Sequence, residues 1–178
     1  IGKLSILHTL RLTGNPPLQV LPNALAEISR FRCPLIFGEP YLTTLELDVN
    51  NFNSPPVEVV SVGIEAIYDY LNLMRLCGVT QTFVYRGRSL VEPPIPLFQL
   101  PTLTLLDLSH NLLKTLPPAL TNLIELRTLM LDSNHLTTVP QPVLSLTNLT
   151  LLSLRDNPLI RIPVGLGDID QIQTLDIG

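Results

Sequence analysis

The feature that most constrains the fold is a period of 23 residues in the C-terminal part of the chain. In the copies that begin at residues 103, 126 and 149, leucine falls at the first, fourth and sixth places and asparagine at the ninth; the copy at residue 80 is irregular, with Arg88 at its ninth place. A proline recurs with the same step, as Pro94, Pro117, Pro140 and Pro163. Because three residue types keep one phase over successive copies, the chain must place the same local structure at the same point of each copy.

Each copy predicts a short strand, a bend and a short helix. Its first half, LxxLxL, ends in the alternation of a strand, and the apolar residues three apart after the proline are typical of a 3₁₀ or α-helical turn. Neither element buries its apolar side alone, so the copies must stack on one another. We expect two leucine columns, one of Leu106, Leu129, Leu152 and Leu175 and one of Leu108, Leu131, Leu154 and Ile177.

The asparagine at the ninth place lies where the chain leaves the strand. Its amide both donates and accepts hydrogen bonds, so it suits the backbone groups that the bend leaves unpaired. The predicted asparagine ladder comprises Asn15, Asn50, Asn111, Asn134 and Asn157.

The pattern LxxLxLxxNxLxxLPxxLxxLxx resembles, place by place, the 23-residue intracellular subclass of the leucine-rich-repeat family, which includes Ras-suppressor-like and scaffold-type members. The resemblance implies an α/β fold: a horseshoe-shaped solenoid with a concave parallel sheet and short helices or 3₁₀ turns on its convex side. It also implies binding of a protein partner on the concave face.

The repeats begin near residues 7, 42, 80, 103, 126, 149 and 172. The longer steps before 42 and before 80 leave an irregular insertion at 29–41, for which we have no prediction, and a second interruption after residue 54. We expect residues 1–178 to form one solenoid that is part of a longer chain.

The second interruption predicts one extended helix over about residues 57–77. Ile64, Ile67, Leu71 and Met74 have helical spacing. Ser54 is the expected N-cap and Gly78 the expected end. The segment is similar to the helix that closes the repeat arrays of Roco-type GTPases, but the chain has no GxxxxGK[ST] phosphate loop. Whether the helix only covers the array or binds a partner stays open.

The charge and hydropathy of the chain exclude some classes of binding partner. The net charge is -4, so we expect no binding to nucleic acid, whose recognition requires a basic surface. No apolar run is long enough to span a membrane. Without a visible leader we expect a cytoplasmic protein, with an extracellular one as the alternative.

The sequence offers no catalytic constellation. His8, His110 and His135 occupy three different places of the repeat, and we find no cysteine cluster and no glycine-rich loop. We therefore expect no enzyme activity, no metal and no cofactor.

The outward positions between the leucines line the expected concave face. There Leu105, Met130 and Leu151 form an apolar strip with a charged border, which is typical of a protein-binding patch. The predicted contact residues are Leu105, Asp107, Ser109, Arg127, Met130, Asp132, Leu151, Ser153 and Arg155. The predicted function is a non-enzymatic interaction module or scaffold in intracellular signalling. The alternative is the recognition or autoregulatory arm of a larger enzyme, such as a Roco-type GTPase or kinase or a ubiquitin ligase.

Overall fold

A computed structural model describes residues 7–15, 17–27, 42, 44–48 and 53–178. Asn50 and the insertion at 29–41 lie outside these residues. The chain divides into two compact units, 1–76 and 77–178. The described parallel strands form two sheets, one of two strands in the first unit and one of five strands in the second. The single solenoid expected over residues 1–178 stays a prediction.

The first unit contains two paired strands, a 3₁₀ helix between them in sequence and two α-helices after them. Strands β1 (Thr9–Arg11) and β2 (Thr44–Glu46) pair in parallel with Leu10 opposite Leu45. The helical elements are the 3₁₀ helix η1 (Asn23–Glu27) and the α-helices α1 (Val57–Val62) and α2 (Ile64–Thr80). The last residues of α2 belong to the second unit.

Where the sequence predicts one helix over about 57–77, the structure has two. The chain breaks at Gly63, whose φ of 121° lies in a region that L side chains rarely adopt. The second helix continues through Gly78 to Thr80. Ser54 is not the cap, because its hydroxyl instead bonds that of Tyr70 at 2.9 Å.

The helix α2 packs against the first unit through two tyrosines. Tyr70 is fully buried and Tyr68 is buried to 6% exposure. The Tyr68 hydroxyl donates a hydrogen bond of 2.6 Å to the carbonyl of Leu25 in η1. This face of α2 therefore covers its own unit.

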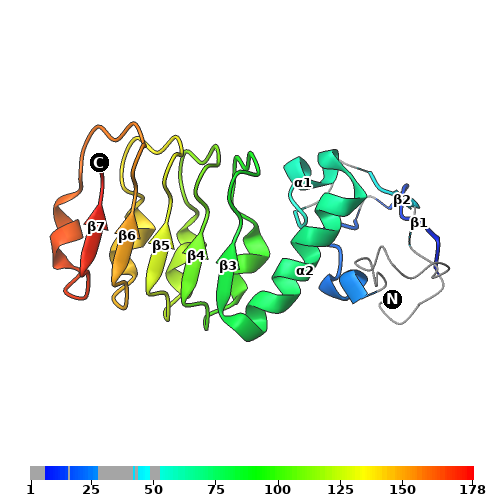
Figure 1. Cartoon of the computed structure of the whole chain (residues 1–178), viewed down its shortest axis with the longest axis horizontal. Helices are drawn as coiled ribbons and strands as arrows, with labels where there is room; N and C mark the ends of the chain where they lie inside the picture. Colours follow the sequence, from blue (N-terminus) through cyan, green and yellow to red (C-terminus); the bar gives the residue numbers. More distant parts are fainter. Residues whose placement is uncertain (1–6, 16, 28–41, 43, 49–52) are drawn as a thin grey trace, which may run out of the picture. The chain divides into compact units, whose positions relative to one another are not determined.

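The second unit is built on a five-stranded parallel sheet in which sequence order is spatial order (Figure 1). Its strands are β3 (Thr82–Val84), β4 (Leu105–Asp107), β5 (Thr128–Met130), β6 (Leu151–Ser153) and β7 (Thr174–Asp176). Each strand pairs with the next at an offset of 23 residues, as with Leu106 opposite Leu129 and Leu129 opposite Leu152. The period seen in the sequence is therefore the register of the sheet.

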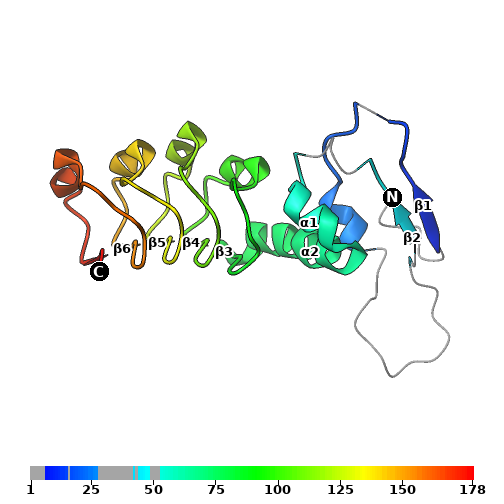
Figure 2. The same ribbon diagram turned by 90° about the horizontal axis from the view of Figure 1, so that it is seen from above.

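Short helices cover one side of this sheet and leave its opposite side uncovered, as Figure 2 shows. They are the 3₁₀ helices η3 (Ile95–Gln99), η4 (Pro118–Asn122), η5 (Gln141–Ser145) and η6 (Val164–Asp168). One of the four periodic prolines directly precedes each helix. Proline suits this place because its fixed φ is compatible with entry into the helix and the helix start needs no N–H from it. The predicted strand and 3₁₀ layers are confirmed.

The core lies between the two layers. Leu106, Leu129 and Leu152 are fully buried, and so are the residues two places later in each repeat, Leu108, Leu131 and Leu154. The last members of the two columns are Leu175 in β7, at 42% exposure, and Ile177 directly after β7, at 38%. Burial in these columns thus depends on a repeat on either side.

The asparagine side chains form hydrogen bonds between each bend and the preceding repeat. Asn134 is 3% exposed, and its Oδ1 accepts from the N–H of Leu113 in the preceding repeat at 3.0 Å. Its Nδ2 donates to the carbonyls of Leu131 in its own repeat and Leu108 in the preceding one, both at 3.0 Å. Bonds of the same kind are formed by Asn111 and Asn157. Among the described residues, the side chain of Asn15 in the first unit bonds its own bend, at the carbonyls of Leu12 and Thr13.

Candidate functional site

The outward side of the five-stranded sheet is the candidate site, and we call it the sheet face. It consists of the third, fifth and seventh residues of each repeat, which alternate with the buried leucines. These residues are Thr82, Val84, Arg86, Leu105, Asp107, Ser109, Thr128, Met130, Asp132, Leu151, Ser153, Arg155, Thr174 and Asp176.

Polar contacts on the sheet face run diagonally, from the seventh residue of one repeat to the fifth residue of the next. The two residues of each diagonal are 21 apart in sequence. Three of the four diagonals hold a polar contact: Arg86 with Asp107, Asp132 with Ser153, and Arg155 with Asp176.

The first diagonal is an ion pair. Asp107 is 1% exposed, and its Oδ2 accepts a hydrogen bond from Nε of Arg86 and forms an ion pair with Nη2 of the same residue. Its Oδ1 accepts from the N–H of Ser109 at 3.0 Å. The hydrogen bond and charge of Asp107 raise the pKa of Arg86 above its ordinary value. Arg86 also brings Nη2 to 3.7 Å from the sulfur of Met130, so its side chain extends from β3 toward β5.

The second diagonal holds a carboxylate that is bound by neutral donors. Oδ1 of Asp132 accepts from the Ser153 hydroxyl at 2.5 Å and from the N–H of Arg155 at 2.9 Å. Among the described residues, no Lys or Arg nitrogen lies within 4.0 Å of this carboxylate. The Arg155 guanidinium is directed instead to Asp176, with 3.6 Å between Nε and Oδ2.

The remaining diagonal, between β4 and β5, joins Ser109 to Met130, and no hydrogen bond forms there. Ser109 is 2% exposed and its hydroxyl has no partner, the only such buried side-chain atom in the part of the chain that the structure describes. A buried hydroxyl without a hydrogen bond costs about 1–3 kcal/mol.

The structure separates the predicted contact residues by burial. Asp107, Ser109 and Ser153 are buried, which the sequence did not predict. Those that are partly exposed are Leu105, Met130, Asp132 and Leu151, and those that are exposed are Arg127 and Arg155. Arg127 precedes β5 and so lies at the other end of the strands from Arg155.

The apolar strip is also less regular than predicted. Leu105 and Leu151 each pair with Thr128 between them, and Met130 lies one row away. The predicted contact set lacks Arg86, which forms the ion pair over Asp107. The signal that identifies it is the diagonal spacing of 21 residues, which requires the register of the sheet to be known.

The described residues give no support for metal binding, for a thiolate nucleophile or for a membrane-spanning helix. No group of three His, Cys, Asp or Glu side chains there could hold a metal ion. Burial raises the pKa of the Cys77 thiol to about 11, so at neutral pH it is not a thiolate nucleophile. None of the described helices combines the length and the apolar character that crossing a bilayer requires.

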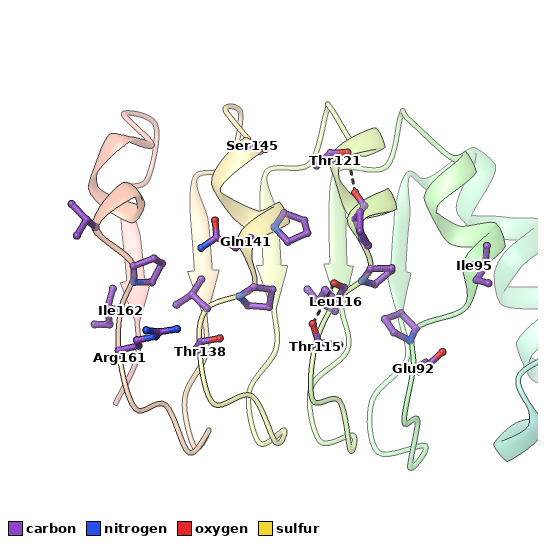
Figure 3. A pocket seen from close by; sticks show the side chains of 18 residues that line it. Glu92, Ile95, Thr115, Leu116, Thr121, Thr138, Gln141, Ser145, Arg161 and Ile162 are labelled. Carbon is purple, nitrogen blue, oxygen red and sulfur yellow. Dashed lines mark hydrogen bonds between the residues drawn. The ribbon is translucent and has the colours of Figure 1, made fainter.

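Another candidate region, which the sequence did not reveal, is a groove on the side of the 3₁₀ helices (Figure 3). Its lining includes Pro93, Pro117, Pro118, Pro140, Pro142 and Pro163. In Figure 3, Glu92 and Arg161 lie toward its opposite ends. Proline has no backbone N–H, so these six lining residues offer no backbone donor to a ligand. We therefore regard the sheet face as the better candidate site.

Comparison with known proteins agrees with this architecture. Leucine-rich-repeat family models match residues 102–123 and 124–178. No match was found among curated proteins. A leucine-rich-repeat protein of Leptospira interrogans has a similar structure over 99% of this chain, with 31% identity and a TM-score of 0.53.

A more distant likeness shows the fold alone. The ectodomain of the Arabidopsis thaliana membrane receptor kinase GASSHO1/SCHENGEN3, solved in complex with CASPARIAN STRIP INTEGRITY FACTOR 2, is similar over 100% of this chain, with 23% identity and a TM-score of 0.51. This chain spans 38% of the Leptospira protein and 22% of the receptor ectodomain. Residues 102–178 therefore consist of leucine-rich repeats, and the chain has the fold of a leucine-rich-repeat protein.

Proposed function

We propose that this chain is a protein-binding module whose partner binds the concave sheet face of the second unit. The observation that carries the proposal is the group of Leu105, Met130 and Leu151, which are partly exposed on a side of the sheet that the core does not use. Exposed Arg155 lies on the same face. An apolar centre with a charged border is typical of a modest protein interface.

We further propose that the module acts without catalysis, as a scaffold in intracellular signalling, and that it works in the cytoplasm. These finer parts rest on the resemblance of its repeats to the 23-residue intracellular subclass. Stacked repeats support such a role because they present a row of outward side chains without disturbing the core.

The test is a double variant, Met130→Asp with Leu151→Asp. Partners are first captured with the full chain and identified by mass spectrometry, and their affinities are then measured by calorimetry. We expect at least a tenfold loss of affinity, because two buried charges replace apolar contacts in the interface. Both side chains are partly exposed, so a thermal melt should show a folded protein.

Ile124→Asp is the matched control. Ile124 is apolar and 59% exposed, and it lies outside the sheet face in the segment between η4 and β5. It should leave binding unchanged. Partners that bind the folded double variant as tightly as the native chain would disprove the proposed surface.

A further inference from the structure

The broken diagonal on the sheet face combines two features that point to a ligand group. The first is the hydroxyl of Ser109, which is buried without a hydrogen-bond partner. It lies at the seventh place of its repeat, on the same face as Met130, where the other diagonals hold polar contacts. A hydroxyl of this kind destabilises the fold unless something else binds it.

The second feature is an unbalanced negative charge. Arg86 pairs with Asp107 and Arg155 pairs with Asp176, which leaves Asp132 as the third carboxylate without a cation of its own. Both hydrogen bonds to Asp132 go to Oδ1, and Oδ2 has none among the described residues. The negative charge of Asp132 contributes to raising the pKa of Arg86, but the guanidinium itself is bonded to Asp107.

The two features are neighbours. Ser109 and Asp132 hold the same place on adjacent strands, and their backbones are joined where the N–H of His110 donates to the carbonyl of Asp132 at 2.8 Å. Adjacent strands are about 4.8 Å apart, so one ligand group with several N–H donors reaches both side chains. The partly exposed Met130 lies beside them; Nη2 of Arg86 is 3.7 Å from its sulfur, and the rest of its exposed side chain offers an apolar surface.

We propose that Ser109, Met130 and Asp132 form a subsite for one basic side chain, lysine or arginine, of the protein bound to the sheet face. The cationic group donates to Oδ2 of Asp132 and to the hydroxyl of Ser109, and its methylene groups lie on Met130. An acidic side chain is disfavoured because it would meet the uncompensated charge of Asp132. The proposal rests on the proposed function, since it names the chemistry of the partner at the same face.

The test uses a random peptide library displayed on phage and selected against the full chain. We expect the enriched peptides to share a lysine or arginine at one position. Replacing that residue by norleucine keeps the methylene groups and removes the charge, and it should lower affinity by about ten- to a hundredfold.

The matching change in the protein is Asp132→Asn. Asparagine keeps the oxygen that accepts from Ser153 and Arg155, and it replaces the charged Oδ2 with a neutral NH2 group that donates instead of accepting. We expect the same ten- to hundredfold loss of affinity for the selected peptides. The control is Asp170→Asn, which removes an exposed carboxylate away from the sheet face and should leave affinity unchanged.

Ser109→Ala gives a readout that a purely structural serine would not give. Removing the unpartnered hydroxyl should raise the melting temperature while it weakens peptide binding. If Asp132→Asn fails to fold, Ser109→Ala and the norleucine peptides still decide the question.

The outcomes separate this subsite from the proposed function. Peptides that share no basic residue and tolerate Asp132→Asn, yet lose affinity for the Met130→Asp and Leu151→Asp double variant, overturn the subsite and leave the proposed function standing. Peptides that tolerate all these variants, or a selection without binders, overturn both.

Discussion

At the scale of single residues, the eighth place of the repeat carries backbone strain that the sequence pattern conceals. Its residues have positive φ angles between 51° and 74°, and they are Gly14, Gly87, His110, Ser133 and Asp156. L side chains adopt this left-handed region at a cost of about 1–2 kcal/mol. The conformation persists because it directs the N–H toward the next repeat, as from Ser133 to the carbonyl of Arg155 at 2.8 Å.

This geometry predicts opposite effects for two substitutions at equivalent places. His110→Gly should raise the free energy of unfolding by roughly 0.5–1 kcal/mol, because relief of the left-handed strain exceeds the entropic cost of glycine. Gly87→Ala should lower it by about 1 kcal/mol. Urea denaturation of both variants beside the native chain measures the two changes.

The control is Gly167→Ala in η6. A methyl group on either Gly87 or Gly167 meets no atom within 4 Å, but only Gly87 has a positive φ. Gly167→Ala should therefore be neutral or slightly stabilising. Equal losses from the two alanine variants would show that backbone strain at the eighth place is not the cause.

At the scale of elements, much of the second unit could be predicted from the sequence. Strands and 3₁₀ helices lie where the leucines and prolines place them, because one period fixes both the register and the layer of every residue. The side chains of Leu106 and Leu129 are buried for the same reason, since the pattern alone assigns them to the core.

The remaining features depend on contacts that no local pattern contains. Asp107 resembles an exposed polar residue in the sequence, and it is buried because Arg86, 21 residues earlier, reaches across the strands to it. Serine, histidine and aspartate share the left-handed eighth place with glycine, so residue type does not reveal that conformation. The predicted single helix breaks because Gly63 permits a φ of 121° in the middle of a helical pattern.

The asparagine ladder predicts a large effect for one buried polar side chain. Asn134→Ala should lower the free energy of unfolding by roughly 2–4 kcal/mol, because it leaves the N–H of Leu113 and the carbonyls of Leu108 and Leu131 with fewer partners inside the protein. Chemical denaturation measures the loss. Asn148→Ala removes a single exposed bond to the carbonyl of Ile124 and should cost less than about 1 kcal/mol. Similar losses from both variants would contradict a structural role for the buried ladder.

At the scale of the whole molecule, stability depends on contacts between successive repeats. In the second unit each strand bonds only to the strand before it and the strand after it. Among the described residues the two sheets share no strand, so no ladder hydrogen bond joins the five-stranded sheet to β1 or β2. A cavity in one column should therefore weaken its own unit without opening the other.

Leu129→Ala tests this expectation, because Leu129 is fully buried in the central strand β5. The cavity should lower the stability of the second unit by roughly 2–5 kcal/mol. Hydrogen exchange followed by mass spectrometry should show faster exchange across residues 82–178 and unchanged exchange in η1 and α1. Leu25→Ala, at a buried position in η1, is the reciprocal variant and should accelerate exchange in the first unit alone. If either substitution accelerates exchange equally in both units, the chain unfolds as one cooperative body. The two units would then not unfold independently, although their strands form separate sheets.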